Sequence, residues 1–151
     1  MEDNYSLSVG CIVRKQDQVL LVRHTYGGAK DKLLIPGGFL QYGELPEEAA
    51  CREVKEETGV TAKAAAILGL RCDKNTWYAL MIMDFVEGEP ESDHSENSEA
   101  VFMKVEEILG REDVTHITKV ALRALLKKGD QILFPDADYK RAKGNDYELY
   151  I

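Results

Sequence analysis

The stretch GFLQYGELPEEAACREVKEETGV occupies residues 38–60 and contains the clearest helical pattern of the sequence. Pro46 suits the first position of a helix, because that position needs no backbone N–H donor. Gly59 suits the position just past the end of a helix, where the backbone turns left-handed. We therefore predict a helix from Pro46 to Thr58.

Three glutamates, Glu53, Glu56 and Glu57, gather on the flank of this helix, beside its apolar face. Each like-charge pair at a spacing of three or four residues is unfavourable by roughly 0.2–0.5 kcal/mol. The negative end of the helix dipole adds about 0.3–1 kcal/mol for each acid. Clustered carboxylates without Cys or His favour a hard cation, Mg²⁺ or Mn²⁺, which would offset this repulsion. The alternative is a charged surface helix whose acids are offset by Arg52 and Lys55.

The whole stretch resembles the signature of the Nudix hydrolases: Gly, five residues, Glu, seven residues, Arg-Glu-aliphatic-x-Glu-Glu-x-Gly-aliphatic. Every specified position is filled, by Gly38, Glu44, Arg52, Glu53, Val54, Glu56, Glu57, Gly59 and Val60. The resemblance implies an α/β protein with the Nudix-type α/β/α sandwich around a mixed β-sheet. We expect a single Nudix domain over residues 1–151, in which about 130–151 form a C-terminal extension whose order the sequence does not define.

The resemblance also implies a reaction. Nudix hydrolases use Mg²⁺, for which Mn²⁺ can substitute, and cleave a nucleoside diphosphate linked to another group by attack of water on phosphorus. The expected substrate is a small nucleotide: a nucleoside triphosphate, a nucleotide sugar or a dinucleoside polyphosphate. The implied metal ligands are Glu53, Glu56, Glu57 and the backbone of Gly38. The alternative is a catalytically silent Nudix-fold module that senses a nucleotide or binds a partner.

Four further residues of this region would support the ligands. Arg52 would hold a neighbouring glutamate in place, and Glu44 would belong to the same network. Gly37 would let the backbone approach a metal or a phosphate without a side chain in the way. Gly59 would end the helix that carries the glutamates.

The general base stays open among four glutamates. Glu56 and Glu57 belong to the signature, whereas Glu96 and Glu99 lie in the acidic segment 87–99. Glu99 stands where many similar proteins have an acid shortly before an aromatic strand. A dense acidic segment is otherwise typical of a solvated, mobile loop. The catalytic candidates are Glu53, Glu56, Glu57, Arg52 and Glu99.

Arg23, Phe39 and Tyr78 are the residues that we expect to bind substrate. Arg23 ends the strand before the glycine-rich loop, where a basic residue often contacts the phosphates in similar proteins. Phe39 and Tyr78 offer rings for stacking on a base, although aromatic residues commonly pack in a core or a loop. Residues 75–77 read Asn-Thr-Trp, where ADP-ribose pyrophosphatases tend to carry a proline. Tyr78 roughly matches a tyrosine of diadenosine polyphosphate hydrolases.

The rest of the sequence alternates expected strands and helices, which predicts an α/β protein. The predicted strands are Leu7–Val13 and Val19–Arg23, which form a hairpin, then Leu33–Ile35, Ala64–Leu70, Trp77–Val86 and Val101–Met103. The apolar character of Trp77–Val86 predicts a central strand. A second amphipathic helix is expected from Val114 to Leu125, with its end at Gly129.

The composition restricts the class of partner. The net charge of −8 disfavours binding of bulk nucleic acid or of acidic membrane surfaces. No apolar run approaches the roughly 20 residues that cross a bilayer. The three cysteines lie far apart without a Cys-x-x-Cys pair, so we expect a soluble, cytoplasmic protein. Dimers are common among similar proteins, and aromatic residues near the C-terminal end could serve a homodimer.

Overall fold

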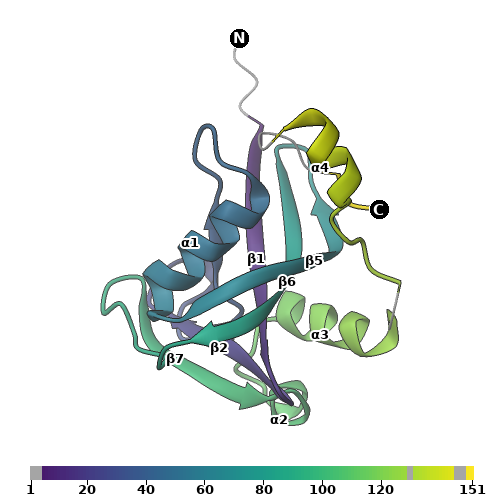
Figure 1. Ribbon diagram of the computed structural model, residues 1–151. Helices are drawn as coiled ribbons and strands as arrows, with labels where there is room; N and C mark the ends of the chain where they lie inside the picture. Colours follow the sequence, from purple (N-terminus) through teal and green to yellow (C-terminus); the bar gives the residue numbers. More distant parts are fainter. Residues whose placement is uncertain (1–4, 129–130, 145–148) are drawn as a thin grey trace.

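A mixed β-sheet is built around the long strand β1 (Ser6–Lys15) in the computed structural model, which describes residues 5–128, 131–144 and 149–151. β1 pairs antiparallel with β2 (Gln18–His24) and parallel with β6 (Thr76–Glu87), so β6 is central as predicted. The strand order is β3-β2-β1-β6-β5, with β3 at Leu33–Leu34 and β5 at Thr61–Cys72. The predicted mixed sheet is confirmed (Figure 1).

On one of its two sides, β1 pairs with two different strands along its length. Its first half pairs with β4 (Gly37–Phe39), through Ser8–Gly10, and its end pairs with β2, through Arg14–Lys15. β4 was not among the predicted strands, because its two glycines and the preceding proline give no strand pattern. The pairing holds the glycine segment flat against β1.

Helices cover both faces of the sheet (Figure 1). α1 (Pro46–Thr58) has the bounds that the sequence predicts, and Gly59 follows it with a φ of 73°. On the other face lie α2 (Val105–Gly110), which was not predicted, and α3 (His116–Lys128). The predicted end of this last helix at Gly129 lies outside the described residues. The chain therefore has the α/β/α layers of the predicted sandwich.

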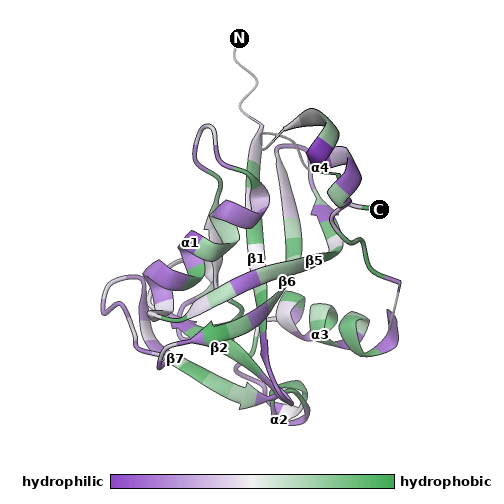
Figure 2. Cartoon of the chain, in the orientation of Figure 1, coloured by the Kyte–Doolittle hydropathy of each residue, from purple (hydrophilic) through white to green (hydrophobic). Residues whose placement is uncertain are grey.

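Alternation along β1 divides the core into two layers. Val9 and Cys11 pack with Val54 of α1, whereas Ile12 packs with Leu122 of α3 on the opposite face. Hydrophobic residues concentrate on the strands and on α3, while α1 shows both polar and apolar residues (Figure 2). The α1 residues that do not enter the core are therefore free to line a site.

The segment that follows α3 returns to the sheet. Leu133 pairs with Ile67 of β5, and a short helix, α4 (Ala137–Lys143), follows. This segment belongs to the C-terminal extension expected at about 130–151, of which residues 130 and 145–148 lie outside the described part. In the described residues, no helix is long and apolar enough to span a membrane.

Candidate active site

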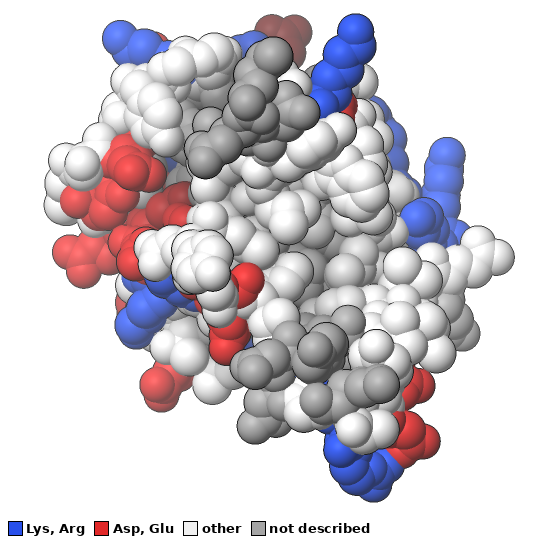
Figure 3. All heavy atoms as spheres, turned by 90° about the horizontal axis from the view of Figure 1, so that it is seen from above, with Lys and Arg blue, Asp and Glu red and all other residues white. Residues whose placement is uncertain are grey.

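A cleft of about 640 Å³ opens between α1, β4, the segment before β7 (Asn97–Lys104) and the adjoining ends of β5 and β6. Its volume lies in the range of small-molecule sites. One end is acidic, and its carboxylates are Glu53, Glu56, Glu57, Asp93 and Glu96. Seen from above, acidic side chains gather on the side of the molecule where α1 lies (Figure 3). The three glutamates of α1 therefore share one cavity with the glycine segment.

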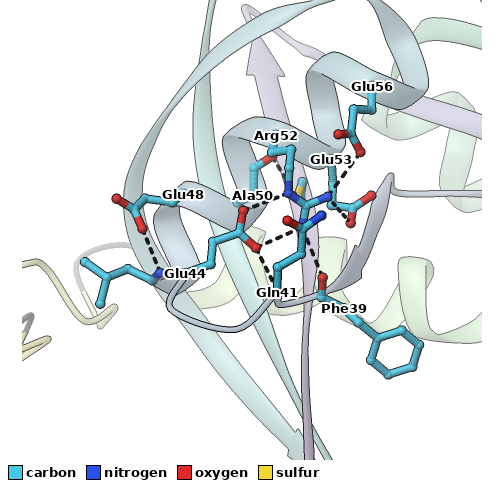
Figure 4. Close-up of polar contacts among 10 residues, drawn as sticks. Phe39, Gln41, Glu44, Glu48, Ala50, Arg52, Glu53 and Glu56 are labelled. Atoms are coloured by element: carbon cyan, nitrogen blue, oxygen red, sulfur yellow. Dashed lines mark hydrogen bonds and ion pairs between the residues drawn. The ribbon is translucent and has the colours of Figure 1, made fainter. Parts of the chain in front are cut away.

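Arg52 ties two of these glutamates to the loop before α1 (Figure 4). Its Nη1 donates to Glu53 Oε1 at 2.7 Å and to Glu56 Oε2 at 3.1 Å. Its Nε donates to Glu44 Oε1 at 2.7 Å, and its Nη2 donates to the carbonyl of Phe39 at 3.1 Å. The hydrogen bonds that Arg52 donates to Glu44 and Glu53 raise its pKa, so it stays charged. This geometry supports the predicted positioning roles of Arg52 and Glu44.

Glu57 is the most deeply placed of the acids, with 4% of its surface exposed. Its Oε1 accepts a long hydrogen bond of 3.4 Å from the backbone N–H of Gly37. Its Oε2 is buried and has no hydrogen-bond partner in the described residues. Burial, followed by the nearby charges of Glu53 and Glu96, raises the pKa of Glu57 to about 8. The carboxyl is therefore largely protonated at neutral pH unless positive charge reaches it.

The glycine segment can lie against these acids only because it has no side chains. A Cβ at Gly38 would come within 2.5 Å of the carboxyl carbon of Glu53. A Cβ at Gly37 would collide with the carbonyl oxygen of Val9 in β1. Gly37 is therefore required by its close approach to β1, and a Cβ at Gly38 would displace the carboxylate of Glu53.

The donor set of the acidic end suits a hard divalent cation, because it consists of carboxylate oxygens. In the described part of the chain, however, no three Asp, Glu, His or Cys side chains stand together as a metal site. Arg52 accounts for this arrangement, since it contacts one oxygen each of Glu53 and Glu56. The buried Oε2 of Glu57 lacks a partner that a cation would provide. The residues thus fit the predicted group if Glu56, which is exposed, turns from Arg52.

The acidic segment before β7 is held in place rather than solvated throughout. Asp93 Oδ1 accepts hydrogen bonds from the backbone N–H groups of Ser95, Glu96 and Asn97, at 2.9, 3.0 and 3.0 Å. The side chain of Asn97 is buried, and its Nδ2 donates to the carbonyl of Glu57 at 2.9 Å. These bonds fix the segment against the end of α1, with Asp93 and Glu96 at the cleft.

Glu99 and Arg23 lie apart from the cleft, contrary to the arrangement that we expected. Glu99 is not in the loop, because β7 begins at Asn97 and pairs Glu99 with Arg23 of β2. Arg23 Nε donates to Glu99 Oε2 at 2.8 Å, and its Nη1 donates to Asp113 at 3.1 Å. Neither residue lines the cleft. The antiparallel register joins them to each other and brings Glu96 to the site instead.

The two aromatic residues predicted to bind substrate both line the cleft. The side chain of Phe39 is 63% exposed. The ring of Tyr78 is mostly buried, and its face is covered by the guanidinium of Arg71, whose carbon lies 4.7 Å from the ring centroid. Tyr26 stacks on His24 with 5.1 Å between the ring centroids and forms another wall.

Arg71 is one of the cleft residues that sequence reasoning missed. It lies near the end of β5 and faces Tyr78 across the strand pair. The sequence gives one signal for it: Arg71 stands two residues before Asp73, which also lines the cleft. Residues two positions apart lie on the same face of an extended chain. The pairing of β5 with β6 could not be read from that spacing.

Known proteins with similar sequences or structures identify the family. The model of the NUDIX domain matches residues 4–125. An ADP-ribose pyrophosphatase of Methanocaldococcus jannaschii is 38% identical over 65 residues, which are 43% of this chain and 38% of the relative. The NAD-capped RNA hydrolase NudC of Photobacterium profundum is 33% identical over 99 residues, which are 64% of this chain and 36% of the relative. The matched segments thus span well under half of these relatives.

A solved structure shows the same fold. The crystal structure of a NUDIX hydrolase from Nitrosomonas europaea has a TM-score of 0.76 and 20% sequence identity, over 85% of this chain and 73% of that chain. The family model covers most of the sequence and includes the glycine segment, α1 and its three glutamates. This chain therefore belongs to the NUDIX domain family.

Proposed function

We propose that this chain is a pyrophosphohydrolase that depends on Mg²⁺, or on Mn²⁺ in its place. Its substrate is a small molecule in which a nucleoside diphosphate is linked to another group. One observation carries the proposal: Glu57 is buried beside the glycine segment with an unpartnered oxygen, in a cleft that it shares with Glu53 and Glu56. The names of the pyrophosphatase and RNA-cap relatives agree with cleavage of such a bond.

Glu53, Glu56 and Glu57, with the backbone of Gly38, would hold the cation. A bound divalent cation would offset the charge of phosphate oxygens and lower the pKa of a water molecule. Arg52 positions Glu53 through a hydrogen bond that leaves the second oxygen of this carboxylate available, and Glu56 would leave Arg52 to reach the cation. A side chain at Gly38 would displace the carboxylate of Glu53 from this position.

We assign the general base to Glu96 among the four candidates. Glu56 and Glu57 are needed as ligands, and Glu99 pairs with Arg23 outside the cleft. Glu96 lines the cleft from the segment that faces α1, on backbone held by Asp93. Its carboxylate would take the proton of water as the new O–P bond forms and the bridging P–O bond breaks.

A substrate panel tests the proposed function. The purified protein should release a nucleoside monophosphate or its equivalent from nucleoside triphosphates, nucleotide sugars or dinucleoside polyphosphates when Mg²⁺ is present. Excess chelator should abolish this release. Glu57→Gln should lose several orders of magnitude in kcat while its fold is kept, because a ligand oxygen is lost without loss of volume. Binding of a nucleotide without any product would contradict the proposal and indicate a silent module.

Two further properties stay predictions from the sequence. A cytoplasmic location agrees with the absence of disulfides among Cys11, Cys51 and Cys72. Dimerisation through aromatic residues near the C-terminal end can be measured by sedimentation of the purified chain.

A further inference from the structure

Four residues form a row across the floor of the cleft, one on each of four neighbouring strands. Phe39 of β4 pairs with Ser8 of β1, Ser8 pairs with Tyr78 of β6, and Tyr78 pairs with Arg71 of β5. Directly paired residues lie on one face of a sheet, and all four line the cleft. Three spacings between neighbouring strands separate the backbone of Arg71 from that of Phe39 by about 14 Å. Phe39 follows Gly38, which lies at the acidic end of the cleft. The row therefore leads away from the acidic end toward Arg71.

The guanidinium of Arg71 is oriented but has its donors free. It lies over the ring of Tyr78 at 4.7 Å, and in the described residues it has no hydrogen bond or ion pair. Tyr78 is itself held in place, because its hydroxyl occupies the space that a Cβ at Gly10 would need. Arg52, the other arginine of the cleft, is occupied by its carboxylate partners. Arg71 is therefore the cleft arginine that can meet a substrate.

Asp73 adds a fixed acceptor beside these donors. Its Oδ1 accepts hydrogen bonds from the backbone N–H groups of Asn75 and Thr76, at 2.9 and 2.8 Å, and it lines the same cleft. A phosphate that approached Arg71 would be repelled by this carboxylate. A nucleobase, in contrast, offers both acceptors and N–H donors on one edge. The combination of Arg71 and Asp73 thus favours a base over a further phosphate.

We propose that Arg71 and Asp73 bind the nucleobase of the substrate and select guanine. The guanidinium donates to O6 and N7, two adjacent acceptors that suit a bidentate arginine. The carboxylate of Asp73 accepts from the N1–H and N2–H groups next to them. This inference rests on the proposed function, because it assumes that the diphosphate lies at the acidic end of the cleft.

The test compares deoxynucleotides that differ in the base alone. For the wild type with Mg²⁺, kcat/KM should be about 10-fold or more higher for dGTP than for dATP, and 7-deaza-dGTP, which lacks N7, should lose most of this advantage. Arg71→Gln should lower kcat/KM for dGTP by about 10-fold or more and should not lower it for dATP, because glutamine can pair with N6 and N7 of adenine. The matched control is Arg14→Gln, since Arg14 pairs with Asp84 outside the cleft.

Asp73→Asn provides a second test of base selection. It should reduce kcat/KM for dGTP and change dATP little, because only guanine offers two adjacent N–H donors to the carboxylate. An equal loss for all nucleotides in Arg71→Gln would show that Arg71 binds phosphate, and no loss would show that it binds nothing. Either result overturns the inference.

Calorimetry separates this inference from the proposed function. If no nucleotide is hydrolysed, the proposed function fails, but the subsite can still be read from product binding. Tighter binding of dGMP than of dAMP, abolished by Arg71→Gln, would support the subsite independently of turnover. Equal binding of the two monophosphates by the wild type would overturn it.

Discussion

Glu57 is the residue whose surroundings are least favourable for its own charge. It is almost fully buried, one of its oxygens lacks a partner, and other acids stand nearby. A buried carboxylate without compensation is costly, so the metal-free protein keeps the proton instead. Its one hydrogen bond, from the backbone N–H of Gly37, does not offset this burial, and a residue that breaks several local rules in this way is typical of a functional site.

Glu57→Gln should change the pH dependence of stability in the metal-free protein. Because the folded-state pKa of Glu57 is raised to about 8, its stabilising contribution is complete below the usual pKa near 4.5 and is lost as the pH rises through 8. The loss is about 5 kcal/mol at most, at about 1.4 kcal/mol per pKa unit. Glutamine stays neutral, so the variant should keep its free energy of unfolding between about pH 5 and pH 9.

Urea unfolding in the presence of chelator, at several pH values, measures this difference. Glu106→Gln is the matched control, because Glu106 is exposed on α2 and should leave the wild-type pH dependence unchanged. If the wild type and Glu57→Gln lost stability in parallel between about pH 5 and pH 8, the buried carboxyl would not be the titrating group.

At the scale of elements, the end of α1 and the segment before β7 form one unit. The last carbonyls of a helix lack partners within the helix. Here the carbonyl of Glu57 accepts from Asn97 Nδ2, and the carbonyl of Thr58 accepts from the backbone N–H of Glu91 at 2.9 Å. The segment that completes α1 therefore also delivers Glu96 to the cleft.

Glu96→Gln and Glu99→Gln form a matched pair of variants that tests whether Glu96 is the general base. Glu96→Gln should lower kcat by about 10²-fold or more with Mg²⁺ present, as expected for loss of a general base. Glu99→Gln should leave kcat within a few-fold, because Glu99 pairs with Arg23 on the neighbouring strand. Steady-state kinetics on the best substrate of the panel provides the comparison. The reverse order of effects would exclude Glu96 as the base.

The elements that the sequence predicts well are those with local signals. α1 has the predicted bounds because Pro46, the apolar spacing and Gly59 all lie within the helix or next to it. β4, by contrast, becomes a strand through its pairing with β1, which no local pattern reveals. The early start of β7 and the meeting of Arg71 with Tyr78 likewise depend on strand register.

At the scale of the whole molecule, an acidic protein would have to bind an anionic substrate. The net charge is −8, and acidic side chains gather around the α1 side (Figure 3). A diphosphate would be repelled there unless bound cations reversed the local field. The sandwich places α1 on one face of the sheet. The glutamates of α1 therefore lie in the cleft at the end of the sheet where β1 pairs with β4 on one side and with β6 on the other.

Titration of the metal-free protein with Mn²⁺, followed by calorimetry at neutral pH, tests most directly whether the three glutamates of α1 hold a divalent cation. We expect at least one site per chain, competition by Mg²⁺, release of protons as Glu57 ionises, and affinity about 10-fold or more weaker in Glu57→Gln. No binding of either ion by the wild type, or equal binding by the wild type and Glu57→Gln, would contradict this account.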